Sequence, residues 1–209
     1  MFGEVPRIER EDPLFIALFG YTNVLSVALG YRDLLTRLHS ERVLGISEAI
    51  GVACGLSEAE LGILRIAASL HDVGKIGIPD HILLKPHSLD QAERERIRQH
   101  SEIGQSIVAA TKLQGAQQAS LVIRHHHEHY NGLDYPDGLS GEAIPVCSRI
   151  ISVADSYDAM AVTRAYQEPK SHSGIMDILH QETAEKHDPE VMRVFCQIIE
   201  TSRFKAPGL

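Results

Sequence analysis

The residues most suited to chemistry stand together at 125–129, where the chain reads His-His-His-Glu-His. Four imidazoles in five positions are difficult to explain by core packing, whereas histidine is a frequent metal ligand and titrates near neutral pH. The turn that follows contains Asn131, Gly132, Pro136 and Gly138, residue types that give a loop a defined geometry. This pattern predicts a metal centre with a shaped loop beside it.

Further potential ligands are distributed along the chain. The segment His71-Asp72-Val73-Gly74-Lys75 places an imidazole, a carboxylate and an amine near the end of an expected helix. Both ligand groups can reach one ion at such an end, and the carboxylate can bridge two ions through its two oxygens. An isolated His-Asp pair occurs by chance, but His39, His100 and Asp155 occur in the same chain. The whole set favours a metal site over scattered surface histidines.

Composition limits the function class. The chain has 209 residues, which fit one domain with a substantial core. A formal net charge of −8 argues against a protein that binds nucleic-acid polymers, which would present a basic face. The three cysteines, Cys54, Cys147 and Cys196, lack Cys-x-x-Cys spacing and predict a reducing, cytoplasmic environment.

The N-terminal part contains no basic-then-apolar signal sequence. Residues 14–31 carry no charge, but Thr22, Asn23 and Ser26 make the stretch less apolar than a typical membrane span. We therefore expect a buried or dimer-forming helix and no membrane span. Residues 1–30 are interpreted as an apolar helical segment packed on the domain or at a homodimer interface, and residues 31–209 as the metal-binding domain.

The hydrophobic periodicity is helical nearly throughout, and no alternating strand of useful length is present, so we predict a single all-α domain. Ser57 with Glu60 and Ser88 with Gln91 are helix-start signals, and Asp188 before Pro189 is a third. Gly55 marks a helix end. The expected helices cover 33–54, 57–71, 88–111, 116–127, 146–163 and the residues after 188, and the expected structured loops cover 74–86 and 130–145.

Several motifs together resemble the HD-GYP proteins, a subgroup of the HD metal-dependent phosphohydrolases. They agree with this family in residue type, order and spacing over roughly residues 36–166. The matching segments are His39-Ser40-x-Arg42-Val43, residues 71–80, Leu84-Lys85-Pro86, His100-Ser101-x-x-Gly104, His126-His127-Glu128, Asn131-Gly132-x-Asp134-Tyr135-Pro136, Ile144-Pro145, Arg149-Ile150, Val153-Ala154-Asp155-x-x-Asp158-Ala159 and Arg164-x-Tyr166.

The resemblance implies a helical HD-type fold, two divalent metal ions and hydrolysis of cyclic di-GMP or a related cyclic dinucleotide. Iron is the favoured metal, with manganese or zinc as alternatives, because imidazole and carboxylate ligands suit these ions. A water shared by two cations becomes a hydroxide at neutral pH and can attack the phosphodiester in line. Carried over position by position, the metal ligands are His39, His71, Asp72, His100, His126, His127 and Asp155, with Asp72 bridging.

The resemblance also implies roles beside the metals. Lys75 would neutralise developing charge or assist the leaving group. Arg164 would contact the second phosphate or a guanine in a bidentate manner, and Tyr135 would line the pocket and touch the substrate. His125 and His129 are interpreted as flanking residues without a ligand role.

Four positions depart from the family pattern. Leu35 stands where proteins with a third metal have a glutamate, so we predict two metals. Asp134 replaces the glycine of the Gly-Tyr-Pro motif, and we expect its carboxylate to disfavour an anionic substrate unless it points to solvent. Asn131 replaces the usual aspartate. Gln167 replaces a frequent cation, which removes a phosphate contact.

Two alternatives remain open beside the phosphodiesterase. The first is a metal-bearing receptor or adaptor that binds a nucleotide with little turnover and signals through a protein partner such as a cyclic-di-GMP synthase. The second is an HD phosphohydrolase acting on another nucleotide. The altered loop and Gln167 favour the receptor, whereas the intact ligands and Lys75 favour the enzyme.

Overall fold

The computed structural model describes residues 13–162 and 169–207. These ranges are helical, apart from loops and an isolated bridge between Thr183 and His187, which confirms the predicted all-α class. The α-helices are α1 (Pro13–Arg32), α2 (Leu34–Ala53), α3 (Glu58–Leu70), α4 (Asp80–Leu83), α5 (Gln91–Arg98), α6 (His100–Ala109), α7 (Ala116–Arg124), α8 (Val146–Ala161), α9 (His172–Gln181) and α10 (Pro189–Ile199), and the short 3₁₀ helices are η1 (Val73–Gly77) and η2 (Gly141–Ala143).

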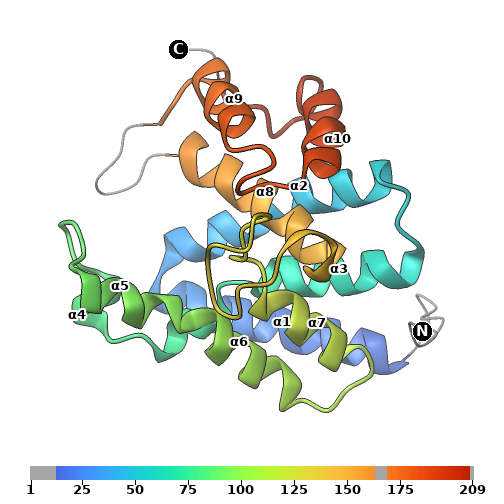
Figure 1. The fold of residues 1–209 in the computed structure, drawn as a ribbon. Coiled ribbons are helices and arrows are strands. Elements are labelled where there is room, and N and C mark those ends of the chain that lie inside the picture. The colour runs from blue at the N-terminus through green and yellow to red at the C-terminus, as the bar shows by residue number, and fades with distance from the viewer. Residues whose placement is uncertain (1–12, 163–168, 208–209) are drawn as a thin grey trace.

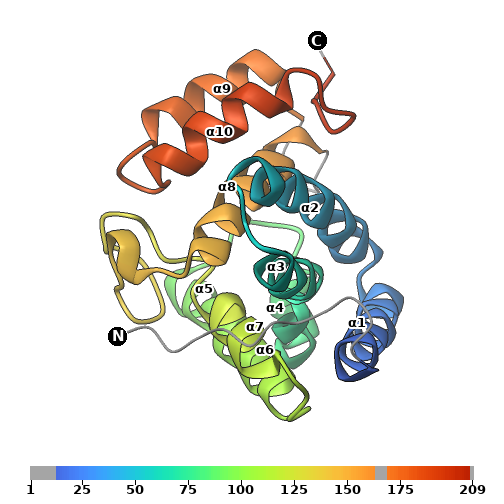
Figure 2. The same cartoon turned by 90° about the vertical axis from the view of Figure 1, so that its right-hand side faces the viewer.

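Helices α2, α3 and α8 form the middle of the molecule (Figures 1 and 2). The α6–α7 pair packs on one side of this group, and the α9–α10 pair covers the other side. Side chains from all these layers meet in one core, in which Ile50, Leu64, Ile123, Ile151 and Phe195 are fully buried. The metal-ligand candidates therefore lie on elements that a shared core holds in fixed relation.

Helix α1 packs on α2 and α3, and Arg32 in its last turn joins it to residues 71–80, the HD segment. The Arg32 guanidinium donates to the carbonyl oxygens of Lys75 and Ile76 at 2.8 and 2.6 Å and pairs with Asp80. Residues 14–31 are helical as expected, although Tyr31 in this helix is exposed. None of the helices described here is both long and apolar enough to cross a bilayer.

Three local helix signals are confirmed. Ser57 and Glu60 form a complete capping box at the start of α3, and the Asp188 carboxylate caps α10 ahead of Pro189. Gly55 follows α2 with a φ of 75°, a left-handed conformation in which glycine has no Cβ penalty.

Other local predictions are wrong. The helix near residue 90 is capped by Asp90 with Glu93 and not by Ser88 with Gln91, because the carboxylates accept the terminal N–H groups at 2.9 Å. The expected long helix over 88–111 is two helices that meet at Gln99. The expected loop over 74–86 contains most of η1 and all of α4, and helix α9 was not predicted.

Candidate metal centre

The HD segment begins where α3 ends. His71 is the C-cap of α3, and Asp72 precedes the tight turn η1. Gly74 in this turn lies directly against α6, because a Cβ at that position would stand 1.9 Å from the carbonyl oxygen of His100. The absence of a side chain at Gly74 thus allows the HD segment to approach His100.

Three of the histidines are oriented in the same way. The Nδ1 atoms of His71, His100 and His126 each lie 2.6–2.8 Å from a backbone carbonyl three residues earlier, at Ala68, Ile97 and Ile123. A neutral imidazole that donates from Nδ1 presents an unprotonated Nε2. In its neutral form each ring would therefore direct a lone pair into the space between α3, α6 and α7, an outer-shell arrangement common at metal-ligating histidines.

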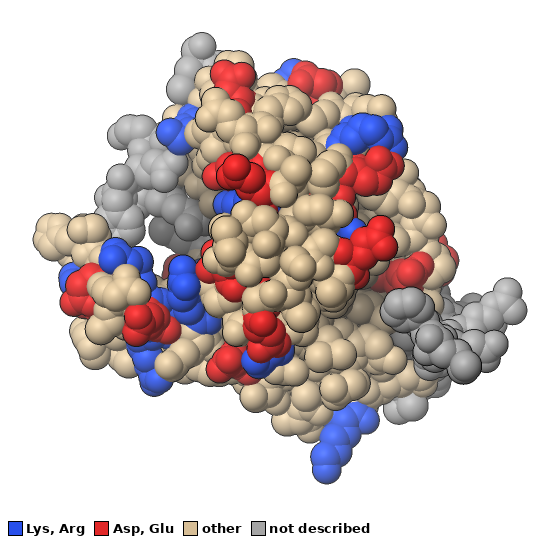
Figure 3. All heavy atoms as spheres, in the orientation of Figure 1, with Lys and Arg blue, Asp and Glu red and all other residues tan. Residues whose placement is uncertain are grey.

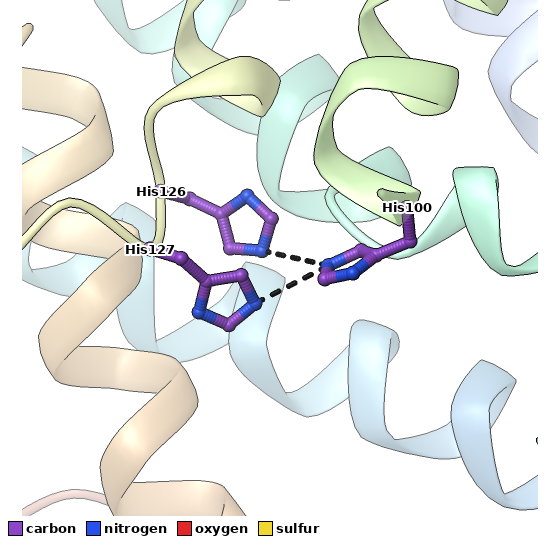
Figure 4. A group of neighbouring side chains, drawn as sticks. All are labelled: His100, His126 and His127. Carbon is purple, nitrogen blue, oxygen red and sulfur yellow. Dashed lines mark hydrogen bonds between the residues drawn. The ribbon is translucent and has the colours of Figure 1, made fainter. Parts of the chain in front are cut away.

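The first group of ligand atoms comes from His100, His126 and His127 (Figure 4). His100 Nε2 lies 3.4 Å from His126 Nε2 and 3.2 Å from His127 Nε2. Because the Nδ1 atoms of His100 and His126 donate their protons to backbone carbonyls, the Nε2 lone pairs of these two rings face each other. A metal–nitrogen distance of about 2 Å places neighbouring ligand nitrogens about 3 Å apart, so a cation fits this spacing.

The second group comes from His39, His71 and Asp72, with Asp155 adjoining it. His39 Nε2 is 2.9 Å from Asp155 Oδ1, and its Nδ1 is 2.6 Å from Asp158 Oδ2. Asp158 is in turn held by Arg42 at 2.7 Å. Asp158 is thus an orienting residue for His39.

Asp72 lies between the two groups. Its Oδ1 is 3.5 Å from His100 Nε2, and its Oδ2 is 3.6 Å from His71 Nε2. The Lys75 ammonium also contacts Oδ2, at 2.6 Å. His71 Nε2 is buried without a hydrogen-bond partner in the described structure, which is unusual for a polar atom in a protein interior. Each oxygen of Asp72 therefore faces a different set of imidazoles.

The electrostatics of the two groups differ. Burial lowers the pKa of His126 to about 3 and that of His127 well below its usual range, so both rings are neutral at pH 7. Burial also acts to lower the pKa of His39, but Asp155 and Asp158 outweigh it and raise that pKa to about 9. Burial opposes ionisation of Asp72, yet the positive charge of Lys75 and the neighbouring histidines hold its pKa well below the usual range.

The donor set fits divalent transition metals. Neutral imidazoles and ionised carboxylates without thiolates suit iron, manganese or zinc. The structure brings all seven predicted ligands together from five parts of the chain: His39 from α2, His71 and Asp72 after α3, His100 from α6, His126 and His127 after α7, and Asp155 from α8.

The sequence predicted that the Asp134 carboxylate would disfavour an anionic substrate unless it pointed to solvent. In the structure it does not point to solvent. Its side chain is only 17% exposed and pairs with Arg98 at 3.2 Å and with His129 Nε2 at 3.0 Å. On the face shown in Figure 3, Lys and Arg side chains alternate with Asp and Glu side chains over α4 and α5. Helix α5 carries Arg98. The added negative charge is thus neutralised locally.

The Tyr135 ring packs between the candidate ligand His127 and the guanidinium of Arg98. Its ring stacks on that of His127, with centroids 4.9 Å apart, and the Arg98 guanidinium carbon lies 4.7 Å from the Tyr135 ring centroid. The Tyr135–Pro136 peptide bond is cis. The altered motif therefore still places its tyrosine against a candidate ligand.

His125 and His129 lie outside the two ligand groups. His129 pairs with Asp134, and His125 Nε2 pairs with Asp137 at 2.9 Å. Asp137 is also held by Arg124 at 2.7 Å, so this acidic group already has a cation partner.

A cavity of about 220 Å³ opens beside the candidate ligands His127 and Asp155. Its other walls come from α8 and from the turn between α9 and α10, where Glu182 and Lys186 lie. Sequence reasoning missed these two residues, and it also missed the roles of Arg98 and Asp158, because no local pattern marks their long-range contacts. The predicted substrate contact Arg164 and the departure at Gln167 lie outside the described residues, as does the side chain of Leu35.

A helical domain with a histidine–aspartate centre of this kind defines an HD-type metal site. A family model described as an HD domain matches residues 24–191. The chain belongs to the HD domain family, and its motifs and relatives place it in the HD-GYP group, as the sequence resemblance predicted.

The relatives are longer proteins. The chain is 38% identical over 190 residues to a cyclic di-GMP phosphodiesterase of Thermotoga maritima, covering 91% of this chain and 50% of that protein. It is 34% identical over 173 residues to 3′3′-cGAMP-specific phosphodiesterase 2 of Vibrio cholerae, covering 83% of this chain and 33% of that protein. The chain thus spans between a third and a half of the length of these relatives.

The fold also matches solved structures. The HDG"Y"P protein Bd1817 from Bdellovibrio bacteriovorus superposes with a TM-score of 0.65 at 17% identity, covering 91% of this chain and 66% of that one. This likeness supports the HD-type helical arrangement.

Proposed function

We propose that this chain hydrolyses a phosphodiester bond of cyclic di-GMP or a related cyclic dinucleotide at a centre of two divalent metal ions. The observation that carries this proposal is the position of Asp72, whose two oxygens face different groups of imidazoles. The names of the relatives, which act on cyclic di-GMP and on 3′3′-cGAMP, support the substrate class.

In this proposal His100, His126 and His127 hold one ion, and His39, His71 and Asp155 hold the other, with Asp72 between them. The favoured metal is iron, with manganese or zinc as alternatives. Two divalent ions held by these residues would supply a water molecule of lowered pKa and a binding site for the phosphate oxygens.

The side chains around this centre position the metal ligands and neutralise negative charge on the substrate. Lys75, beside Asp72, supplies a positive charge where negative charge develops on the phosphate or the leaving oxygen. Asp158, held by Arg42, fixes the ring of His39 so that Nε2 faces Asp155. Tyr135, stacked on His127, lines the site beside the metal centre and contacts the bound nucleotide. Arg164 remains a proposed phosphate contact.

We also propose, from the sequence, a cytoplasmic location and, as partner, a second copy of this chain or a cyclic-di-GMP synthase.

The test combines metal content with product analysis on one sample. Protein loaded anaerobically with iron, or in parallel with manganese, is incubated with cyclic di-GMP, while linear and mononucleotide products are quantified by chromatography. We expect two metal ions per chain together with product. Two ions and tight nucleotide binding without product would instead support the receptor alternative, and protein without metal would contradict the site assignment.

A matched pair of variants tests the bridging role. Asp72→Ala is expected to lose binuclear occupancy, whereas Asp177→Ala, which removes an exposed carboxylate on α9, is expected to retain both ions. Retention of both ions in Asp72→Ala would refute the bridge.

A further inference from the structure

Arg32, the last residue of α1, makes contacts that metal binding and core packing do not explain. Its side chain is 24% exposed, and all three of its guanidinium nitrogens donate to η1 or to the residues just after it. We propose that Arg32 is a positioning residue, which holds η1 in the shape that places the Lys75 ammonium on Asp72. This inference rests on the proposed function and deepens it, because it assigns the placement of the Lys75 cation to a residue outside the site.

The Arg32 guanidinium reaches three backbone carbonyls at the end of η1 and just after it. Its Nη1 donates to the carbonyl oxygens of Lys75 and Ile76 at 2.8 and 2.6 Å, and its Nη2 donates to that of Ile78. Nε and Nη2 also donate to Asp80 Oδ1, at 3.0 and 2.6 Å. Carbonyls at the end of a helix depend on donors from outside it, and here one planar cation from a distant helix supplies them.

The 3₁₀ geometry of η1 is what brings Lys75 to Asp72. In a 3₁₀ helix the side chains of residues i and i+3 eclipse each other, and Lys75 follows Asp72 by three positions. The Lys75 N–H donates to the Asp72 carbonyl at 3.0 Å, and the Lys75 ammonium lies 2.6 Å from Asp72 Oδ2. Runs of 3₁₀ helix longer than about 3–4 residues are uncommon, because their hydrogen bonds have poorer geometry. The five-residue η1 therefore depends on contacts from other elements.

Two helices supply these contacts. Gly74 lies so close to α6 that no side chain fits between them, which fixes the first part of η1, and Arg32 fixes its end. Helix α1 is joined to α2 through Asp33, whose carboxylate accepts from the N–H and the hydroxyl of Thr36 at 3.2 and 2.6 Å. Arg32 thus stands next to the start of the helix that carries the candidate ligand His39.

Attraction between Arg32 and Asp80 explains only part of this arrangement. The Asp80 side chain is 71% exposed, and an ion pair in contact with water contributes little. The contacts with the carbonyls require the planar fork of arginine, whereas a lysine has a single nitrogen on a flexible chain. Residue 32 is therefore expected to act through its shape, and a substitution that keeps only its charge can show this.

The reactivity of the Lys75 amine tests the positioning without turnover. The folded chain, incubated with Mn²⁺, is treated with a limiting amount of an amine-reactive ester, and modification of each lysine is quantified by mass spectrometry. The Lys75 side chain is only 21% exposed while it lies on Asp72. We expect Arg32→Gln to raise the modification rate of Lys75 about threefold or more, because an ammonium released from this contact is more accessible. Lys112, an exposed residue after α6, is the internal control and should keep its rate.

Steady-state kinetics test whether this placement matters for the reaction. A cation that stabilises charge developing in the transition state affects kcat more than KM. With cyclic di-GMP, Lys75→Gln should lower kcat about a hundredfold, the order expected for loss of one stabilising group. Arg32→Gln should lower kcat about tenfold and leave KM within about twofold, because Lys75 is displaced but still present. In the Lys75→Gln background, Arg32→Gln should have almost no further effect, since the residue through which it acts is gone.

Three further variants separate shape from charge. Arg32→Lys keeps the charge without the fork and is expected to recover little of the lost kcat. Asp80→Asn removes the exposed partner of Arg32 and leaves the carbonyls, so kcat should stay within about twofold of that of the unmodified chain. Arg37→Gln removes a cation that pairs with Glu41 on α2, and this matched control should leave kcat unchanged. Metal content and melting temperature, measured on each variant, verify that the ligands and the fold are intact.

The outcomes separate the role of Arg32 from the proposed function. Unchanged Lys75 reactivity in Arg32→Gln overturns the positioning role, whether or not cyclic dinucleotides are hydrolysed. In an active chain, a further tenfold loss of kcat in the Lys75→Gln background would show that Arg32 acts independently of Lys75, and full activity of Arg32→Lys would show that charge suffices; either result overturns the role. Raised Lys75 reactivity in a chain that hydrolyses no cyclic dinucleotide retains the positioning role and overturns the proposed function.

Discussion

At the scale of single residues, the centre depends on side chains that hold other side chains in place. His39 faces Asp155 because Asp158 binds its other nitrogen, and Asp158 is fixed by Arg42. The loop is organised in the same way, since Arg98 both neutralises Asp134 and covers the Tyr135 ring. The departure from Gly-Tyr-Pro at Asp134 is accordingly accompanied by a compensating cation.

The first residue-scale prediction concerns this compensation. Arg98→Gln leaves the Asp134 carboxylate facing an anionic substrate with His129 as its remaining partner. A partly exposed ion pair contributes about 1 kcal/mol. If its loss weakens substrate binding by this amount, kcat/KM should fall roughly fivefold, mainly through a higher KM. The double variant Arg98→Gln, Asp134→Gly removes both charges and is expected to recover most of the loss.

Steady-state kinetics of the two single variants and the double variant check this coupling, with Arg96→Gln on the same helix as the charge-matched control. A double variant as impaired as Arg98→Gln alone would show that Arg98 contacts the substrate directly and does not act through Asp134.

The second residue-scale prediction concerns protons. A histidine must be neutral to bind a metal ion, and His39 holds its proton up to a pH of about 9 in the metal-free chain. Metal binding at this position therefore displaces a proton below pH 9, and the affinity should rise about tenfold per pH unit from pH 7 to 8.5. His126, with a pKa of about 3, adds no proton in this range.

Competition of Mn²⁺ with a chelator of known pH dependence measures this slope. Asp158→Asn removes one of the carboxylates that raise the pKa of His39, so the affinity should reach its plateau at lower pH. A pH-independent affinity in the unmodified chain would contradict the expected proton release.

At the scale of elements, the sequence predicted what neighbouring residues determine by themselves. The capping box of Ser57 and Glu60 and the cap at Asp188 involve contacts within three residues, and both were predicted correctly. The helix start near residue 90 was predicted at Ser88 with Gln91, whereas Asp90 with Glu93, which also matches the capping pattern, caps α5. The wall of Glu182 and Lys186 depends on how a turn packs against a distant loop, which no local pattern reports.

The turn between α9 and α10 gives an element-scale prediction. Ala184 adopts a φ of 68°, a left-handed conformation that costs a residue with a Cβ about 1–2 kcal/mol. Ala184→Gly should remove this strain and increase the free energy of unfolding by roughly 0.5–1 kcal/mol, since part of the gain is offset by the greater freedom of glycine in the unfolded chain.

Urea denaturation measures this change, and Ala49→Gly in the interior of α2 is the control. The control substitution should lower the free energy of unfolding by about 1 kcal/mol, because glycine is a poor helix former. If both substitutions destabilise the chain to the same extent, then Ala184 is not strained.

At the scale of the whole molecule, the candidate ligands join most of the helical layers. They come from α2, the end of α3, α6, the end of α7 and α8, whereas α9 and α10 supply none of the seven. Metal ions bound at this centre would connect elements that the core otherwise holds by side-chain packing. The α9–α10 pair contributes a wall of the cavity and packs on α8 and α2.

This division predicts how metal removal changes stability. One ion that binds the folded chain and not the unfolded chain stabilises it by about 2.7 kcal/mol when present at a hundred times its dissociation constant. For a chain of 209 residues this corresponds to a rise in melting temperature of about 5–10 °C. Chelation should reverse the rise, and Asp72→Ala should show a smaller one.

Hydrogen exchange locates the effect within the molecule. Removing the metal should increase exchange around residues 71–77 and 100–104 and at the end of α7, where ligands from separate helices would lose their common ion. Phe195 and its neighbours in α10 are anchored by the core and should keep their protection. Equal loss of protection in α10 and in the segment at residues 71–77 would mean that the chain unfolds as one unit, and that the metal ions do not act locally by joining the ligand-bearing helices.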